Sequence, residues 1–353
     1  MTIGLPEGVL EPANALRFRE YLPALLETIG SLAAYLQEQY PKSHEFMSVS
    51  AQQADPFARV YAQWDKSGHT DPQPLPTKAE ARAIFYLQGR PNAQIGAFLA
   101  VNGTALLEML DGARTAFASD RLLVAFGLLR GVIERAAHAW SLACVLRPVM
   151  TGREQTANPL LEVIGVSGEI ARALYGTKMN WMTLATSDLT KVKKGEAEYN
   201  KKDGRLNLLA SSILSGIDRL DKKVAGTRIV YEILCEFLHP NTGDLFATTV
   251  NATSMTDQHG TRLIYRTIGA GPKNLSGVHE LDHILAMCCK HLVVILATIS
   301  EIHAELRCIH QKIIIRTQKY MRHALKKNRG VFSCHDLCPC FSGKQVAFCC
   351  GKP

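Results

Sequence analysis

The sequence predicts a mostly α-helical protein: a multi-helix bundle with one β-hairpin insert, at about residues 244–268, and a small cysteine-rich C-terminal knuckle. Apolar residues recur at helical spacing through long segments, and only 7% of residues are aromatic, which favours helices over a β-sandwich. Hydrophobic residues make up 47% and charged residues 20%, so the chain can bury a sizeable core and lacks the composition of a disordered protein.

The expected helices are 13–39, 78–87, 92–118, 120–146, 158–174, 177–189, 205–221, 225–238 and a long last helix from about 276 to 327. Pro148 and Gly152 are expected to end the helix over 120–146, because proline lacks the N–H that continues a helix. DLFATTVNAT and TRLIYRTIG are rich in β-branched residues, and SMTDQHG separates them, which predicts the hairpin.

Four regions follow from this pattern. Residues 1–76 form an N-terminal helical region and connector, and 77–305 a helical core domain with the hairpin. Residues 306–330 form a basic helix or linker, and 331–353 form the knuckle.

The net charge of +8 comes from the tail of the chain. From residue 306 onward there are ten basic residues and one acidic residue, Asp336, whereas the body is nearly neutral. The candidate binding residues are Lys312, Arg316, Lys319, Arg322, Lys326, Lys327 and Arg329. Such a localised excess predicts a polyanionic partner, RNA or the ribosome, or an acidic protein. The alternative is a solvated helix end that interacts favourably with the helix dipole.

Two cysteine pairs, Cys338 with Cys340 and Cys349 with Cys350, have the number and proximity of ligands for a tetrahedral zinc site. No secretory signal is expected from the first residues of the sequence, so metal ligation is favoured over disulfides. Four cysteines leave no open coordination position, which predicts one structural Zn²⁺ per chain. Cys334 and His335 are alternative ligands, and a redox-active cluster is the competing interpretation.

The segment CPCFSGKQVAFCCG (338–351) resembles the SEC-C motif, which reads roughly CPCGSGKKYKKCCG. Phe341 replaces a glycine, Val346 replaces an aromatic residue, and Phe348 offers a ring nearby. This motif lies at the C-terminus of the bacterial protein-translocation ATPase and is appended to other bacterial proteins. The resemblance implies a zinc knuckle that docks on proteins or ribosomes.

In the body, Arg130 and Glu134 fall one turn apart on a very apolar helix, and His239 precedes a proline at the end of another. An Arg-x3-Glu helix with a helix that ends in His-Pro resembles an all-helical bacterial family of unknown function. The resemblance covers about residues 90–300 and implies that Arg130, Glu134 and His239 converge on one catalytic site. The alternative is a structural ion pair and a helix-capping histidine.

Two further patterns carry enzyme hypotheses. Arg316 and His323 are similar to the Arg-x4–6-His pattern of HEPN ribonucleases, helical proteins of toxin and antiphage defence systems, which would act on the ribose hydroxyl and phosphate. His279-Glu280-Leu281-Asp282-His283 matches the H-E-x-x-H helix of zinc proteases, the least favoured hypothesis because no third ligand follows at a suitable distance.

The leading interpretation is a cytoplasmic bacterial zinc-binding protein whose basic tail docks on nucleic acid, ribosome or a protein partner. A HEPN-like ribonuclease is the alternative, so whether the protein is an enzyme stays open. No membrane association is expected, because charges interrupt the most apolar stretches before about twenty residues.

Overall fold

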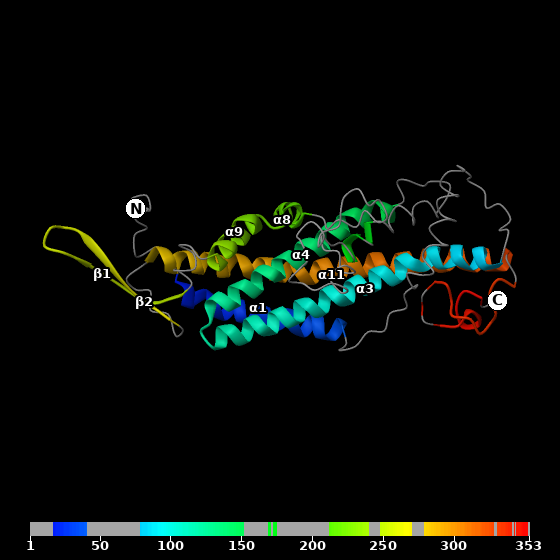
Figure 1. Ribbon diagram of the computed structural model, residues 1–353, viewed down its shortest axis with the longest axis horizontal. Helices are drawn as coiled ribbons and strands as arrows, with labels where there is room; N and C mark the ends of the chain where they lie inside the picture. Colours follow the sequence, from blue (N-terminus) through cyan, green and yellow to red (C-terminus); the bar gives the residue numbers. More distant parts are fainter. Residues whose placement is uncertain are drawn as a thin grey trace, which may run out of the picture. The chain divides into compact units, whose positions relative to one another are not determined.

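The computed structural model describes residues 17–40, 78–151, 169–170, 172–174, 212–239, 248–269, 279–327, 330–340, 342 and 344–351 (Figure 1). The helices within these residues include α1 (Phe18–Gln39), α3 (Lys78–Ala118), α4 (Leu122–Thr151), α8 (Ile213–Asp221), α9 (Thr227–Leu238) and α11 (His279–Lys327). The strands are β1 (Thr249–Thr256) and β2 (Arg262–Ile268), and a short 3-10 helix, η2 (Val346–Phe348), lies in the knuckle. The predicted mostly α-helical fold with one β-hairpin is confirmed.

The chain divides into two compact units. Unit 1 comprises Met1–Lys42, Asn102–Trp140 and Ile213–Ile302, and unit 2 comprises Ser43–Val101, Ser141–Ser212 and His303–Pro353. The helices α3, α4 and α11 each contribute residues to both units. The region boundaries expected from the sequence, after residues 76, 305 and 330, stay predictions.

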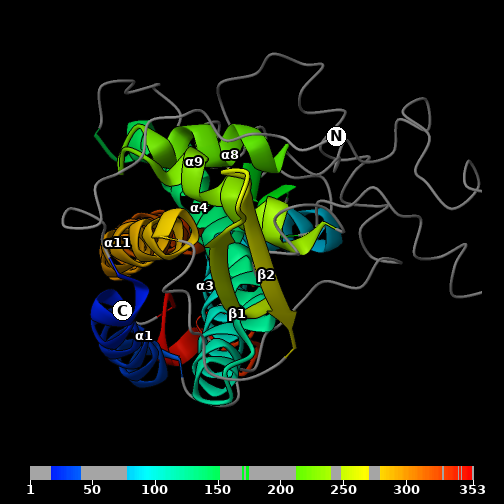
Figure 2. The ribbon, with the colours of Figure 1, turned by 90° about the vertical axis from the view of Figure 1, so that its left-hand side faces the viewer.

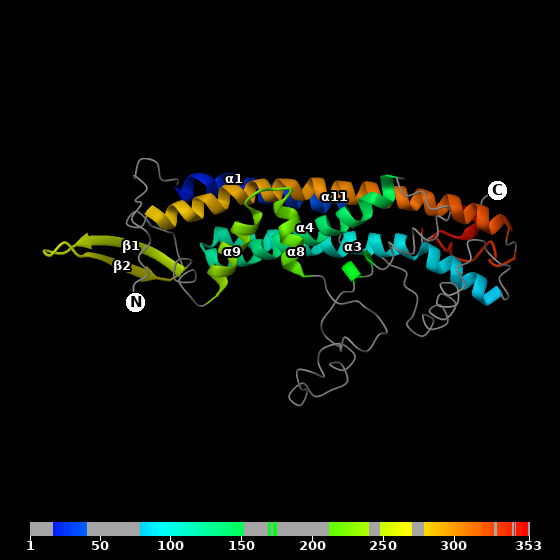
Figure 3. The ribbon, with the colours of Figure 1, turned by 90° about the horizontal axis from the view of Figure 1, so that it is seen from above.

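In unit 1, α1 runs parallel to the first half of α11 (Figure 3). The N–H of Phe18 donates to the carboxylate of Asp282 over 3.0 Å, and the Tyr35 hydroxyl donates to the carbonyl of Ser300 over 3.3 Å. Asp282 thereby caps α1, whose first N–H groups have no partner within the helix. The buried side chains of α1 are Phe18, Leu25, Ile29, Leu32, Ala33 and Leu36.

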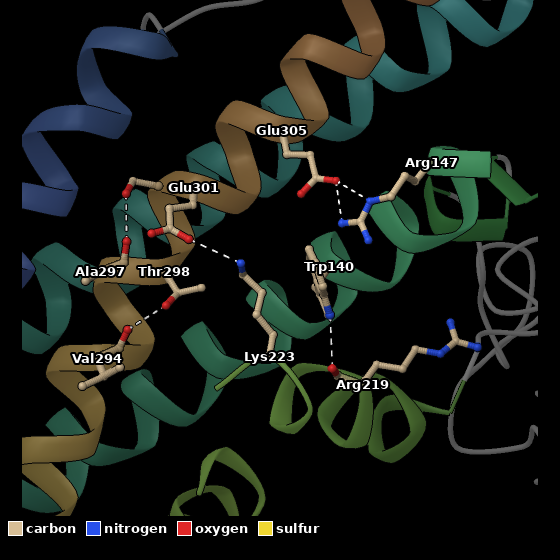
Figure 4. A network of polar contacts seen from close by, with 10 residues as sticks. Trp140, Arg147, Arg219, Lys223, Val294, Ala297, Thr298, Glu301 and Glu305 are labelled. Carbon is tan, nitrogen blue, oxygen red and sulfur yellow. Dashed lines mark hydrogen bonds and ion pairs between the residues drawn. The ribbon is translucent and has the colours of Figure 1, made fainter. Parts of the chain in front are cut away.

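The helices α8 and α9 lie beside α4 in unit 1 (Figure 2). The indole N–H of Trp140 on α4 donates to the carbonyl of Arg219 over 3.1 Å (Figure 4). The amine of Lys223, just after α8, lies 4.9 Å from the Trp140 ring centroid and 3.3 Å from the carboxylate of Glu301 on α11. These contacts tie α8 to both α4 and α11.

The hairpin pairs β1 with β2 in antiparallel register, with Met255 opposite Leu263 and Thr253 opposite Tyr265. The carboxylate of Asp257 accepts hydrogen bonds from the N–H groups of His259 and Thr261, and Gly260 has a φ of +83°. The turn therefore spans 257–261, within and just after the predicted SMTDQHG segment. In Figures 1 and 3 the hairpin projects away from the helices of its unit.

The expected break between helices over 78–87 and 92–118 is wrong, because α3 is one helix with Pro91 inside it. Proline removes one hydrogen bond of the helix ladder. The residue that follows, Asn92, is held from both sides: His310 of α11 contacts its carbonyl at 3.0 Å, and its side-chain amide donates to the carbonyl of Cys340 over 3.2 Å. Contacts with distant residues thus stabilise a helix that Pro91 would otherwise tend to interrupt.

The expected helix end before Pro148 is also wrong, because α4 continues through Pro148 to Thr151. Arg147, in unit 2, forms a two-pronged ion pair with Glu305 of α11, with N–O distances of 2.6 and 2.9 Å (Figure 4). This pair fastens the turn that contains the proline. The helices expected at 158–174 and 177–189 fall almost entirely outside the described residues, although 169–170 and 172–174 are helical.

By length and composition alone, two segments within these helices could cross a membrane, Gly89–Ala118 and Asp282–Lys326. In the most apolar stretch of each segment, 50% is buried inside the protein. Core helices of soluble proteins can be equally long and apolar. The expectation of no membrane association stays a prediction.

Candidate metal centre

The knuckle folds around a short antiparallel contact between Leu337 and Gln345. The N–H of Cys338 donates to the carbonyl of Lys344, and the N–H of Val346 donates to the carbonyl of Asp336, both over 2.8 Å. These two bonds close the intervening turn and bring the first cysteine pair opposite the segment that carries the second.

The four predicted ligand residues converge. The sulfur atoms of Cys338, Cys340, Cys349 and Cys350 all lie within 4.8 Å of one another. The sulfur atoms of Cys340 and Cys349 are 3.4 Å apart, and those of Cys349 and Cys350 are 3.8 Å apart. A tetrahedral site with metal–sulfur bonds of about 2.3 Å requires sulfur–sulfur distances of about 3.8 Å. The cluster therefore fits a single metal ion.

Gly351 follows the last ligand and has a specific steric role. Its N–H donates to the carbonyl of Val346 over 2.8 Å, which turns the chain end back across η2. A Cβ at this position would lie 2.4 Å from Cγ1 of Val346 and 2.8 Å from its carbonyl oxygen. Only glycine permits this close approach, so the motif glycine is explained by packing.

The sulfur atoms of the cluster lie close enough to share hydrogen bonds, and these bonds shift the pKa values of the thiols in opposite directions. The pKa of Cys340 is lowered to about 2, because Cys338 and Cys350 donate hydrogen bonds to its sulfur. The pKa values of the donors are raised: that of Cys338 to about 12 through its bond to Cys340, and that of Cys350 through its bonds to Cys338 and Cys340. A divalent cation would stabilise all four groups as thiolates, because its charge offsets theirs, whereas hydrogen bonds between neutral thiols stabilise only one thiolate.

The ligands are also part of the hydrophobic core of unit 2. All four are at most 9% exposed, and they form one buried cluster with Phe85 of α3, Met321 of α11 and Val346. Ala324, Leu325, Val331 and Phe332 pack against this cluster. Figure 1 shows the knuckle beside the C-terminal end of α11 and the N-terminal end of α3. The knuckle is therefore packed onto both helices.

A polar clamp fastens the knuckle to α3. The guanidinium of Arg82 donates to the carboxylate of Asp336 over 2.8 Å and to the carbonyl of Val331 over 3.2 Å, and it lies 4.6 Å from the Phe332 ring centroid. The same carboxylate oxygen accepts the N–H of Ser333 over 2.7 Å. The hydrogen bond from Asp336 raises the pKa of Arg82. The one acidic residue of the tail is thus paired.

Sequence reasoning missed Arg82 and Asn92, although both hold the knuckle in place. Each lies about 250 positions away in the chain, and neither belongs to a motif. The alternative ligands Cys334 and His335 are exposed and do not belong to the metal-binding group found among the described residues. Val346, at the expected aromatic position, is buried, whereas Phe348 is 72% exposed.

The predicted binding residues of α11 share one exposed face. In the described part of the chain, the basic face consists of Lys312, Arg316, Lys319, Arg322 and Lys326, all exposed. The opposite side of the helix is buried at Ile313, Thr317 and Met321. The side chain of Lys327 and residue Arg329 lie outside the described part. The alternation of exposed and buried positions therefore separates a charged surface of α11 from the side that packs within unit 2.

In unit 1, Arg130 and Glu134 form an ion pair of 3.1 Å, and both are about one-third exposed (32%). The buried Tyr231 hydroxyl donates to the same carboxylate oxygen over 2.9 Å and accepts a hydrogen bond from Arg130 over 3.4 Å. Burial raises the pKa of Tyr231. Tyr231, not singled out from the sequence, completes a three-residue network.

His239 ends α9 in an extended conformation and is exposed. It lies eight residues beyond Tyr231, about 12 Å along a helix axis. None of the hydrogen bonds that join Arg130, Glu134 and Tyr231 includes it. His138, two turns after Arg130 on α4, is mostly buried, and burial lowers its pKa. The structure shows the ion pair between Arg130 and Glu134. The convergence of these two residues with His239 on one catalytic site stays a prediction.

The His279-Glu280-Leu281-Asp282-His283 segment forms the first turn of α11. The side chains of His279 and Glu280 are outside the described part, so the protease hypothesis is untested. Asp282 has a structural function in this segment, because it caps α1.

Comparisons of the chain with protein-family models, with curated proteins and with solved structures find no match in any of the three. No family model therefore confirms the SEC-C or the HEPN resemblance. The site itself shows a four-cysteine cluster that could hold one metal ion.

Proposed function

We propose that this protein binds nucleic acid through the basic face of α11, and that a zinc ion in the cysteine cluster holds this end of the helix in place. The observation that carries the proposal is the exposure of five basic side chains on one side of a helix whose other side is buried. From Lys312 to Lys326 the face extends about 21 Å. Phosphates along a nucleic-acid backbone are the simplest match for such a row of charges.

Zinc is the metal that the ligand set favours. Four cysteine thiolates in a tetrahedron select zinc among the metals common in cells, apart from iron in Fe–S sites. The closed ligand shell leaves no position for a substrate, which supports a structural role. A reducing compartment such as the bacterial cytoplasm would keep the four thiols available to bind the metal.

Two features link the metal to the basic face. Met321 belongs to the cysteine cluster and lies between Lys319 and Arg322 in α11. Asp336, the only acidic residue after position 306, is paired with Arg82. The tail thus carries a large excess of basic residues, on a helix end that the zinc-bound knuckle would hold in place.

The test is binding of labelled RNA to the full-length protein, measured by fluorescence anisotropy from about 50 to 200 mM salt. The double variant Lys312→Glu, Lys319→Glu should reduce the slope of log affinity against log salt by about 1.4 to 1.8. Lys290→Glu is the matched control, because Lys290 is an exposed lysine of α11 outside the basic face. Affinity that does not change with salt would overturn the proposal. Capture of a protein that survives nuclease treatment, without RNA binding, would favour an acidic protein partner.

A second candidate function is the HEPN-like ribonuclease. Arg316 and His323 are seven residues apart on α11 and both are exposed, so two turns of helix place them on one side. A ribonuclease would cleave RNA at a rate that falls at least about 100-fold in His323→Ala, the usual range for loss of a general acid or base. Equal cleavage by wild type and His323→Ala would exclude this candidate and leave the binding function untouched.

A further inference from the structure

Among the described residues of the knuckle, Phe348 presents its aromatic ring to solvent. Phe348 is 72% exposed, the highest value among the exposed large hydrophobic side chains of the described residues. It lies in η2, immediately before the ligand Cys349, whose side chain is buried in the cluster. The N–H of Phe348 donates to the carbonyl of Gln345 over 3.0 Å, and the N–H of Ala347 donates to the carbonyl of Cys334 over 3.2 Å. The backbone that carries the ring is therefore held on both sides.

The exposed side chains of the described part of the knuckle are mostly polar or basic. Lys344 and His335 are exposed on the same knuckle, and the knuckle's only acidic residue, Asp336, is paired with Arg82. Among the described residues of the knuckle, Leu337 is the one other exposed large apolar side chain, at 45%. A protein interface usually has a contiguous apolar centre. One exposed ring on a knuckle that also exposes Lys344 instead matches a stacking platform for a nucleic-acid base.

We propose that Phe348 stacks on an unpaired base and that the ligand of this protein is single-stranded nucleic acid. The inference rests on the proposed function, because a strand that extends from the knuckle around α11 would have its phosphates held by the basic face, which lies opposite the side that packs on the knuckle. In a duplex, base faces are covered by neighbouring bases, whereas a single strand can turn a base onto an aromatic ring. The zinc-held turn keeps the ring in place before binding, so little conformational entropy is lost when a base stacks.

The test compares a short oligouridine RNA, an oligothymidine DNA of equal length and an RNA duplex, with zinc-loaded full-length protein. Phe348→Ala should weaken binding of the two single strands by about 5- to 150-fold, the range for loss of one stacked base. Duplex affinity should not change, and Phe348→Trp should retain single-strand affinity. Leu337→Ala is the matched control, an exposed apolar side chain on the same knuckle without a ring. A zinc content of one per chain in each variant shows that the knuckle is intact.

The outcomes separate the two proposals. Equal single-strand affinity of Phe348→Ala and wild type, with binding that still depends on salt, overturns the stacking platform and leaves the nucleic-acid function standing. An equal loss for single strands and duplex also overturns the choice of single strands. Absence of binding to all three probes by wild type overturns both proposals. Comparison of the RNA and DNA oligomers shows which single strand binds more tightly.

Discussion

If the cysteine cluster holds zinc as proposed, removal of the ion should loosen two helices as well as the knuckle itself. The cysteine ligands share a buried cluster with Phe85 of α3 and Met321 of α11, which are 3% and 0% exposed. A knuckle of about twenty residues cannot stay folded without its metal, because it has too little core of its own. Chelation, or the Cys349→Ser substitution, should therefore uncover both side chains.

The size of the effect follows from burial. Complete burial of a Phe or Met side chain contributes about 1.5 to 3 kcal/mol, so the two together contribute about 3 to 6 kcal/mol. At 1.4 kcal/mol for each tenfold change, this corresponds to about two to four powers of ten in the opening equilibrium. Amide hydrogen exchange in residues 82–92 and 313–325 should accelerate by that order, while α1 and α9 keep their protection.

The assay is hydrogen exchange followed by mass spectrometry, with zinc content measured on the same samples. Cys334→Ser is the matched control, because Cys334 is an exposed cysteine next to the knuckle and outside the cluster. It should retain one metal ion and normal exchange. Metal loss without faster exchange in these segments of α3 and α11 would refute the reasoning, because the knuckle would then not support the helices.

Three further predictions concern single residues. Gly351→Ala should lower the free energy of unfolding by about 1 to 3 kcal/mol and weaken zinc retention, because the added Cβ would overlap Val346. An unchanged zinc affinity would contradict this prediction. His303 is fully buried, and burial lowers its pKa from 6.5 to about 4, so the folded state binds fewer protons than the unfolded state. The resulting stability, about 3 kcal/mol, is present above pH 6.5 and is lost as the pH falls toward 4. In urea unfolding at several pH values, the free energy of unfolding of His303→Gln should depend less on pH than that of the wild type. Tyr231→Phe should cost about 1 to 2 kcal/mol in urea unfolding, because Glu134 loses a hydrogen bond at 2.9 Å, and wild-type stability would argue against a structural network.

Local pattern predicted the helices and the hairpin because apolar spacing and β-branched composition act over neighbouring residues. It failed at Pro91 and Pro148. Proline penalises a helix locally, but His310 and Cys340 hold Asn92, and Glu305 holds Arg147, from distant parts of the chain. These contacts have no local signature, so no reading of 88–92 or 146–152 alone could reveal them.

The sequence by itself identified the four cysteines of the cluster, because all four lie within thirteen residues and a short backbone turn brings them together. It also located the basic excess, which is a matter of composition. Only the tertiary structure decided that the side of α11 opposite the basic residues is buried, and that Arg82 and Asn92 form hydrogen bonds with the knuckle. The reason is that burial and long-range hydrogen bonds depend on which helices meet, and helical periodicity leaves that choice open.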